Sequence, residues 1–196
     1  MNKDVKKGLI VFARKPVLGK VKTRLATTLG DKKALEIYIK LLHHTRSIVI
    51  EAECHNFAFL TEQDDQNFWK DFSCFLQKGN SLGDRMYEAF DLLFCKEYQQ
   101  CIIIGSDCPA LTTEIINEAF EKLNTNNFVI GEASDGGYYL LGMKKMHASI
   151  FKNKEWSTKN VFTQTLMDIK KGGFTYHLLP VLNDVDEKED VPKEWL

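Results

Sequence analysis

Short apolar runs alternate along the chain with longer stretches in which apolar residues recur every three or four positions. The runs GLIVFA at Gly8–Ala13 and CIII at Cys101–Ile104 are continuous, which predicts strands buried on both faces. These two are expected to be neighbouring central strands. Further strands are expected at Phe57–Leu60, Phe72–Leu76, Phe128–Ile130, Tyr138–Leu141 and Phe174–Leu179.

Apolar residues at helical spacing predict the helices, as Leu35, Ile39 and Leu42 do in the first of them. Thr112 or Thr113 is expected to cap the third helix. Strands that alternate with helices predict an α/β sandwich with a mostly parallel central sheet and helices on both faces. The helices are expected at Lys32–Ile48, Leu82–Phe94, Thr112–Leu123 and Ser157–Lys171.

Composition narrows the possible functions. The chain has 196 residues, and its 26 basic and 27 acidic side chains leave a net charge of −1, which argues against a general affinity for nucleic acid. No apolar run approaches the roughly 20 residues that span a bilayer, and the N-terminus lacks the pattern of a signal peptide. We expect a single domain over residues 1–196, located in the cytoplasm. Its five scattered cysteines are expected to be reduced and mostly buried.

In folds of this class, ligands bind at the carboxyl ends of the strands. The loop Arg14–Arg24 follows the first strand, and five of its eleven residues are basic. Gly19 within it would let a ligand approach the backbone. A basic, glycine-containing loop between a strand and a helix favours phosphate binding over a merely solvated basic surface.

Carboxylates follow two other strands. Asp107 comes directly after Cys101–Ile104, where an aspartate could bind Mg²⁺ or could only cap the next helix. Asn183–Asp190 holds five carboxylates, which suits either a metal site or an acidic, partly disordered tail. The segment Ser134–Gly137 reads equally well as a hairpin turn or as part of a substrate site. The five histidines receive no role.

Together these segments resemble the DUF2064 family, the GT-A-like proteins called radical-SAM/selenodomain-associated transferase 1. The resemblance covers nearly the whole chain, and its motifs are specific only jointly. It implies a GT-A-like nucleotide-binding sandwich and transferase activity. The motifs are FARKPVLGKVKTRL (Phe12–Leu25), QKGNSLGDRM (Gln77–Met86), GSDCPAL (Gly105–Leu111), SDGGYYLLG (Ser134–Gly142) and NDVDEKED (Asn183–Asp190).

The resemblance also implies roles for individual residues. Asp107 would be the main metal ligand and a catalytic residue, and Asp186 a second ligand, although Glu187-Lys188 replaces the Thr-Pro of related nucleotidyltransferases. Asp135 would be catalytic, with Gly136 and Gly137 lining the acceptor side. The nucleotide-binding residues would be Arg14, Gly19, Lys22, Arg24, Gly79, Leu82 and Gly83.

The expected function is a Mg²⁺- or Mn²⁺-dependent transferase that uses a nucleotide-activated donor, similar to nucleotide-diphospho-sugar glycosyltransferases. One alternative is a nucleotidyltransferase that joins a nucleoside monophosphate to a phosphorylated acceptor and releases pyrophosphate. Another is a nucleotide-binding module without turnover. The expected partners are a nucleotide or nucleotide sugar and a small-molecule acceptor, with no nucleic acid and no membrane span.

Overall fold

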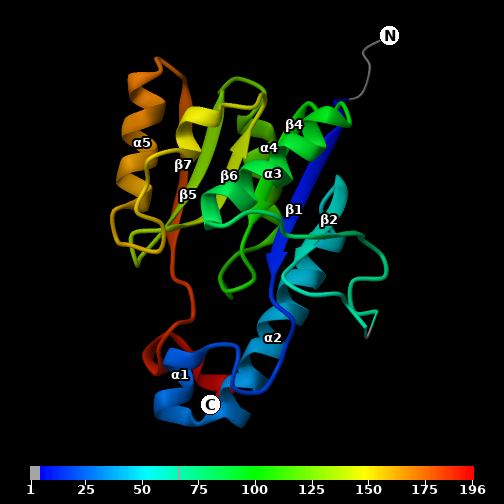
Figure 1. The fold of residues 1–196 in the computed structure, drawn as a ribbon, viewed down its shortest axis with the longest axis vertical. Coiled ribbons are helices and arrows are strands. Elements are labelled where there is room, and N and C mark those ends of the chain that lie inside the picture. Colours follow the sequence, from blue (N-terminus) through cyan, green and yellow to red (C-terminus); the bar gives the residue numbers. More distant parts are fainter. Residues whose placement is uncertain (1–4, 66) are drawn as a thin grey trace.

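A computed structural model describes residues 5–65 and 67–196, and within them seven strands form one sheet (Figure 1). The strands follow the order β3-β2-β1-β4-β6-β5-β7, in which β6 runs antiparallel to both of its neighbours and the other pairs are parallel. The strands are β1 (Lys7–Ala13), β2 (His55–Leu60), β3 (Ser73–Leu76), β4 (Gln100–Ile104), β5 (Phe128–Ala133), β6 (Tyr138–Met143) and β7 (Tyr176–Leu182).

Helices cover both faces of this sheet. None of the helices in the described part of the chain is both long and apolar enough to cross a membrane. The α-helices are α1 (Thr23–Leu29), α2 (Asp31–Ile50), α3 (Leu82–Cys95), α4 (Thr113–Lys122) and α5 (Val161–Lys171). Short 3-10 helices are η1 (Ala148–Phe151), η2 (Lys188–Asp190) and η3 (Lys193–Trp195).

The central strands are buried on both faces, as their continuous apolar sequences predict. Leu9 and Val11 of β1 pack into the core with α2 and α4, whereas Ile10 packs into the core with α3 and α5. Strands β1 and β4 pair in parallel, with Gly8 opposite Cys101. The predicted mostly parallel sheet, with these two as neighbouring central strands and helices on both faces, is therefore confirmed.

Several boundaries differ from those expected. Strand β7 continues through Pro180 to Leu182, which is possible because an edge strand needs no amide donor on its free side. Helix α5 starts at Val161 rather than at Ser157, whose φ of 63° is left-handed and not helical. The short helix α1 was not predicted. Thr112 caps α4, as expected, with its side chain accepting from the Ile115 amide.

All five cysteines are free thiols, but the expectation that most are buried is wrong. Cys101 and Cys108 are buried, whereas Cys74 lies on the edge strand β3 and Cys95 ends α3, so both are exposed.

The acidic C-terminal segment is folded onto the N-terminal helices, so the interpretation of Asn183–Asp190 as a partly disordered tail is wrong. Figure 1 shows this segment beside α1. Val185 and Val191 are buried there, and they share a core with Leu25 of α1 and Leu41 of α2. These apolar contacts hold the neighbouring Asp184 and Asp186 near the carboxyl end of the sheet.

Candidate functional site

A cleft of about 390 Å³ lies at the carboxyl ends of β1, β2, β3 and β4. It brings together residues that are far apart in the sequence, including six of the predicted nucleotide-binding or metal-binding residues. This is the edge at which ligands bind in open α/β sheets. The charged and polar side chains that line it include Arg14, Lys22, Arg24, Tyr38, Thr61, Gln77, Arg85, Asp107, Asp184 and Asp186.

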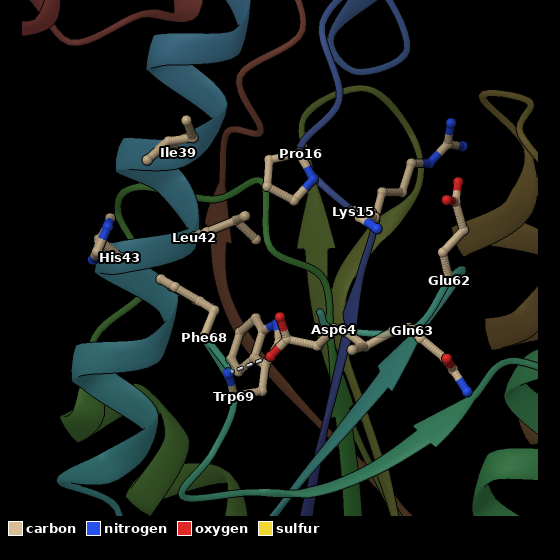
Figure 2. A pocket seen from close by; sticks show the side chains of 12 residues that line it. Lys15, Pro16, Ile39, Leu42, His43, Glu62, Gln63, Asp64, Phe68 and Trp69 are labelled. Carbon is tan, nitrogen blue, oxygen red and sulfur yellow. Dashed lines mark hydrogen bonds between the residues drawn. The ribbon is translucent and has the colours of Figure 1, made fainter. Parts of the chain in front are cut away.

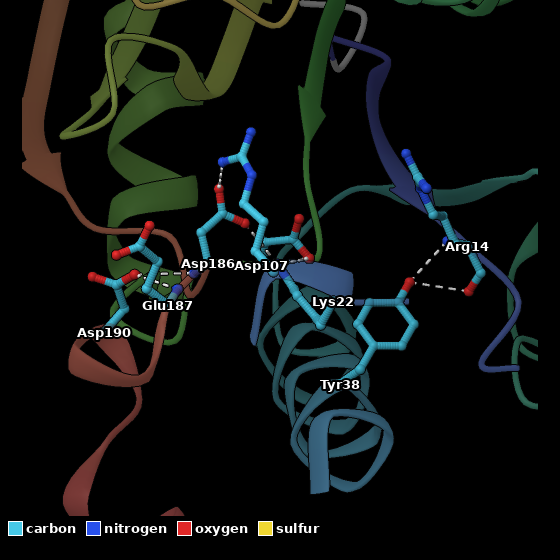
Figure 3. Close-up of polar contacts among 8 residues, drawn as sticks. Arg14, Lys22, Tyr38, Asp107, Asp186, Glu187 and Asp190 are labelled. Carbon is cyan, nitrogen blue, oxygen red and sulfur yellow. Dashed lines mark hydrogen bonds and ion pairs between the residues drawn. The ribbon is translucent and has the colours of Figure 1, made fainter. Parts of the chain in front are cut away.

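Lys22 stands between two of the carboxylates (Figure 3). Its Nζ lies 3.1 Å from Oδ1 of Asp107 and 3.6 Å from Oδ1 of Asp186. The Lys22 side chain is only 6% exposed. The backbone of Lys22 is left-handed, with φ 47° and ψ 46°, a conformation that is uncommon away from glycine and that clusters at functional sites.

Arg24 reaches the same carboxylate group from the solvent side. Its Nη1 donates to Oδ2 of Asp186 at 3.0 Å, and its side chain is 70% exposed. Asp186 is thereby bound by two cations, one buried and one exposed. The exposed guanidinium can turn to a ligand at little cost, because exposed ion pairs contribute only about 0–1 kcal/mol.

The loop after β7 is fixed directly to the loop after β4. The amide of Val185 donates to the carbonyl oxygen of Asp107 at 2.9 Å, and the Val185 side chain is fully buried. Because Val185 points into the core, its neighbours Asp184 and Asp186 are placed in the wall of the cleft. The alternation of one valine between two aspartates therefore creates the acidic part of the site.

Asp190 fixes the conformation of this loop through hydrogen bonds. Its Oδ2 accepts from the amides of Asp186 and Glu187 (Figure 3). Its Oδ1 accepts from Nδ2 of Asn183. Burial raises the pKa of Asp190, but these hydrogen bonds outweigh burial and leave its pKa below the ordinary value. Asp190 thus serves the site as an ionised brace.

Asp184 is a residue of the cleft that sequence reasoning did not single out. Burial raises the pKa of its carboxyl from the ordinary 3.8 to about 7, and the nearby charge of Asp107 adds to the rise. Lys22 opposes this shift. The alternating pattern Asp184-Val185-Asp186 could have revealed it, because two side chains that flank a buried valine share a side of the chain.

Tyr38 was also missed. Its hydroxyl accepts from the Arg14 amide at 2.9 Å and donates to the Arg14 carbonyl at 3.0 Å, so it fixes the start of the basic loop (Figure 3). Burial raises the pKa of Tyr38 to about 12, and the charge of Asp107 contributes to the rise. No sequence signal marks this role, because a tyrosine on the buried face of α2 looks like an ordinary core residue.

The glycines predicted to bind nucleotide do not line the cleft. Gly19 lies in an exposed turn, and Gly79 accepts a hydrogen bond from Nε of the cleft residue Arg85 at 3.2 Å. Gly83 is buried against Trp156, whose ring would lie 2.4 Å from an added Cβ atom. The packing of Trp156 therefore explains the glycine at this position, and a role near the base remains a prediction.

The turn after β5 also lies outside the residues that line the cleft. Oδ1 of Asp135 accepts from the Gly137 amide at 2.8 Å, which is the side-chain pattern of a tight turn in the β5–β6 hairpin. Gly136 has φ 88°, and its carbonyl accepts from the Phe162 amide at the start of α5. The backbone is that of a hairpin turn. The catalytic role of Asp135 and the acceptor-side roles of Gly136 and Gly137 remain predictions.

A second, smaller cavity of about 130 Å³ is lined in part by the Arg14–Pro16 segment (Figure 2). It is enclosed between α2 and the segment that follows β2, with Leu42 and Trp69 in its wall. Its lining shares only Arg14 with the residues predicted from the sequence, so the predicted chemistry is concentrated in the larger cleft.

The carboxylates of the cleft suit a divalent cation that brings further ligands with it. In the described residues no three His, Cys, Asp or Glu side chains form a ready metal cage. However, Mg²⁺ is commonly held by one or two carboxylates together with substrate phosphates and water. Asp107 and Asp186 supply two carboxylates that already share one cation, the Lys22 ammonium. This donor set fits a cation that arrives with phosphates.

Known structures with the same fold support this architecture. A protein from Desulfovibrio desulfuricans G20, described as a candidate nucleotide-diphospho-sugar transferase, superimposes with a TM-score of 0.87 at 27% identity, covering 92% of this chain and 82% of that one. The inositol-1-phosphate CTP transferase of T. maritima gives 0.58 at 9% identity, covering 97% and 93%. The 4-diphosphocytidyl-2C-methyl-D-erythritol synthase of Anaerococcus prevotii DSM 20548 gives 0.58 at 12%, covering 94% and 92%.

These likenesses confirm the expected GT-A-like fold. No curated protein sequence matches the chain. The family described as "Uncharacterized protein conserved in bacteria (DUF2064)" matches residues 40–158. Because this match spans more than half of the sequence and contains Asp107, the protein belongs to the DUF2064 family.

Proposed function

We propose that this protein is a divalent-metal-dependent transferase that uses a nucleotide-activated donor. The observation that carries the proposal is the Lys22 ammonium between Asp107 and Asp186, in a cleft that Arg14 and Arg24 also line. Cations beside paired carboxylates, at the carboxyl edge of a parallel sheet, suit a phosphate chain and its counterion.

In this proposal Asp107 and Asp186 would hold Mg²⁺ or Mn²⁺, with Asp107 the principal ligand because it lies just beyond the buried strand β4. Bound there, such an ion would supply positive charge that offsets the charge of the donor phosphates. Arg24 and Lys22 bind the phosphate oxygens, and Arg14, whose backbone Tyr38 holds, lies where the basic loop leaves β1. Leu82 and the loop that contains Gly79 flank the nucleoside end, and a small-molecule acceptor approaches over the Asp135–Gly137 turn.

Two reactions fit this arrangement. Glycosyl transfer from a nucleotide sugar is supported by the likeness to the D. desulfuricans protein at 27% identity. Nucleotidyl transfer with release of pyrophosphate is supported by the basic loop, which places Arg14, Lys22 and Arg24 in the cleft, where charge-assisted hydrogen bonds can hold the phosphates of a triphosphate. The leaving group distinguishes the two.

The test is a thermal-shift panel of nucleoside triphosphates and nucleotide sugars with and without Mg²⁺ or Mn²⁺. A ligand that binds only the folded state raises the melting temperature by mass action. Stabilising ligands are then incubated with candidate acceptors, and the release of pyrophosphate or of nucleoside diphosphate is measured. No metal-dependent stabilisation by any nucleotide would overturn the proposal, and binding without turnover would favour a nucleotide-binding module.

Arg24→Ala provides a clean check on the phosphate loop. The side chain is 70% exposed, so its removal is expected to leave the melting temperature of the empty protein nearly unchanged while weakening nucleotide binding about tenfold. Lys33→Ala is the matched control, because Lys33 is paired with Glu36 on the surface of α2. Equal nucleotide affinity in both variants would show that the loop is a solvated basic surface that does not bind phosphate.

A further inference from the structure

We propose that the Lys22 ammonium holds the place of the divalent cation until nucleotide arrives, so that the cleft takes up cation and nucleotide together. This inference rests on the proposed function, because it concerns how the same site binds its metal and its nucleotide. The cleft then binds the metal–nucleotide complex, and it binds free metal only weakly.

The geometry of the two ion pairs is the first step. Lys22 Nζ faces Oδ1 of Asp107 at 3.1 Å and Oδ1 of Asp186 at 3.6 Å, so one positive charge already compensates both carboxylates. A metal ion that binds both oxygens would occupy the space in which the ammonium now lies, and it would take over the neutralisation of the two carboxylates. Cation and ammonium therefore compete for the same two oxygen atoms.

The second step is the confinement of Lys22. Its side chain is 6% exposed, the preceding Val21 is buried, and the left-handed backbone of Lys22 leads directly into α1. While it is paired with the two carboxylates, the ammonium therefore has little contact with bulk water. An ion displaced within a partly buried site needs a new partner of opposite charge.

Nucleotide phosphates would be that partner. They bind the released ammonium and supply the remaining oxygen ligands that Mg²⁺ prefers. Arg24 can also move from Asp186 to the phosphates, because its side chain is exposed and is bonded, among the described residues, only to Oδ2 of Asp186. Linkage makes the effect mutual, so that nucleotide raises metal affinity and metal raises nucleotide affinity by the same factor.

The experiment measures Mn²⁺ binding without nucleotide, by the electron paramagnetic resonance signal of free Mn²⁺, in the parent and in Lys22→Met. Removal of the ammonium leaves Asp107 and Asp186 without their shared cation, so Lys22→Met is expected to bind Mn²⁺ about tenfold or more tightly than the parent. Lys22→Arg keeps the charge and should bind as weakly as the parent. Lys20→Met, at an exposed lysine of the same loop that does not line the cleft, should also match the parent.

A second readout is the melting temperature. Lys22→Met is expected to melt lower than the parent in chelator and to regain stability on addition of Mn²⁺, whereas the parent gains little from Mn²⁺ alone. If Lys22→Met does not fold, Lys22→Gln takes its place under the same criteria. Mn²⁺ affinity in the folded Met or Gln variant equal to that of the parent would overturn the inference.

The proposed function fails by a different result. If no nucleotide stabilises the parent with any cation, the transferase proposal falls, whatever Lys22→Met does with Mn²⁺ alone. If nucleotide binds but the parent takes up Mn²⁺ equally well with and without it, the transferase proposal stands and the coupled uptake through Lys22 is wrong.

Discussion

At Asp184 the fold disfavours the charged form of an aspartate. Burial and three neighbouring carboxylates raise its pKa, and Lys22 compensates only in part. Ionisable groups with shifted pKa values often lie at functional sites. In this cleft the carboxylates repel one another, and a bound cation would reduce that repulsion.

Asp184 makes stability depend on pH in a predictable direction. Its carboxyl has a pKa of about 7 in the folded state and an ordinary value of 3.8, so the folded state holds the extra proton between these values. The contribution of Asp184 to stability is therefore full below about pH 4 and is lost as the pH rises to about 7. In Asp184→Asn this loss is absent. Urea denaturation in chelator should show the variant gaining on the parent between pH 5 and pH 8.

The difference between the two proteins is the quantity to follow, because ionisable groups that do not interact with Asp184 contribute equally to both and cancel. A stability difference that is the same at pH 5 and at pH 8 would contradict the raised pKa of Asp184.

The two proposed metal ligands are expected to contribute unequally to metal binding. Asp107 follows a buried central strand, whereas Asp186 lies in a loop and is shared between Lys22 and Arg24. Calorimetry of nucleotide binding with and without Mg²⁺ should show nearly complete loss of metal dependence in Asp107→Asn and partial loss in Asp186→Asn. Asparagine keeps the shape and removes the charge, which limits effects on folding. Unchanged metal dependence in Asp107→Asn would show that this aspartate is not a metal ligand.

At the scale of elements, the start of α3 is set by packing and capping. Ser81 caps it, with its side chain accepting from the Asp84 amide while the Asp84 carboxylate accepts from the Ser81 amide. Trp156, from the segment before α5, lies against Gly83 in the first turn. The helix therefore presents Leu82 and Arg85 to the cleft from a position fixed on its other side.

Gly83→Ala separates packing from nucleotide binding. The new methyl group would lie 2.4 Å from the Trp156 ring, so we expect a loss of roughly 1–3 kcal/mol of stability from overpacking. Trp156→Leu in the same chain should recover part of this loss by making room. If Gly83→Ala leaves chemical denaturation unchanged but abolishes nucleotide binding, then Gly83 serves the ligand, as the family resemblance implies.

At the scale of the whole molecule, the sequence predicted the framework better than the site. Continuous apolar runs identified β1 and β4 because both faces of these strands are covered by helices, and Thr112 marked the start of α4. The basic loop and Asp107 could be placed at the same edge for the same reason. Tyr38 and Asp184 could not, because their roles depend on which distant segments fold against them.

The C-terminal segment shows this dependence most directly. Val185 is fully buried among residues of α1 and α2, and its amide binds the Asp107 carbonyl. Val185→Ala should cost roughly 1–3 kcal/mol in chemical denaturation and should also weaken metal-dependent nucleotide binding, because Asp184 and Asp186 lose their anchor. Val129→Ala, in the buried part of β5 away from the cleft, is the control for stability alone. Equal effects of both variants on binding would rule out the anchoring role.

The ion pair between Arg24 and Asp186 joins positions 162 residues apart. During synthesis on the ribosome, the basic loop and β1 emerge early, whereas Asp184 and Asp186 emerge only after β7. Contacts of such high sequence separation form late, because the chain between them must first be ordered. The growing chain can therefore build most of its sheet before it has a complete cleft, and the capacity to bind a metal–nucleotide complex is expected to arise near the end of folding.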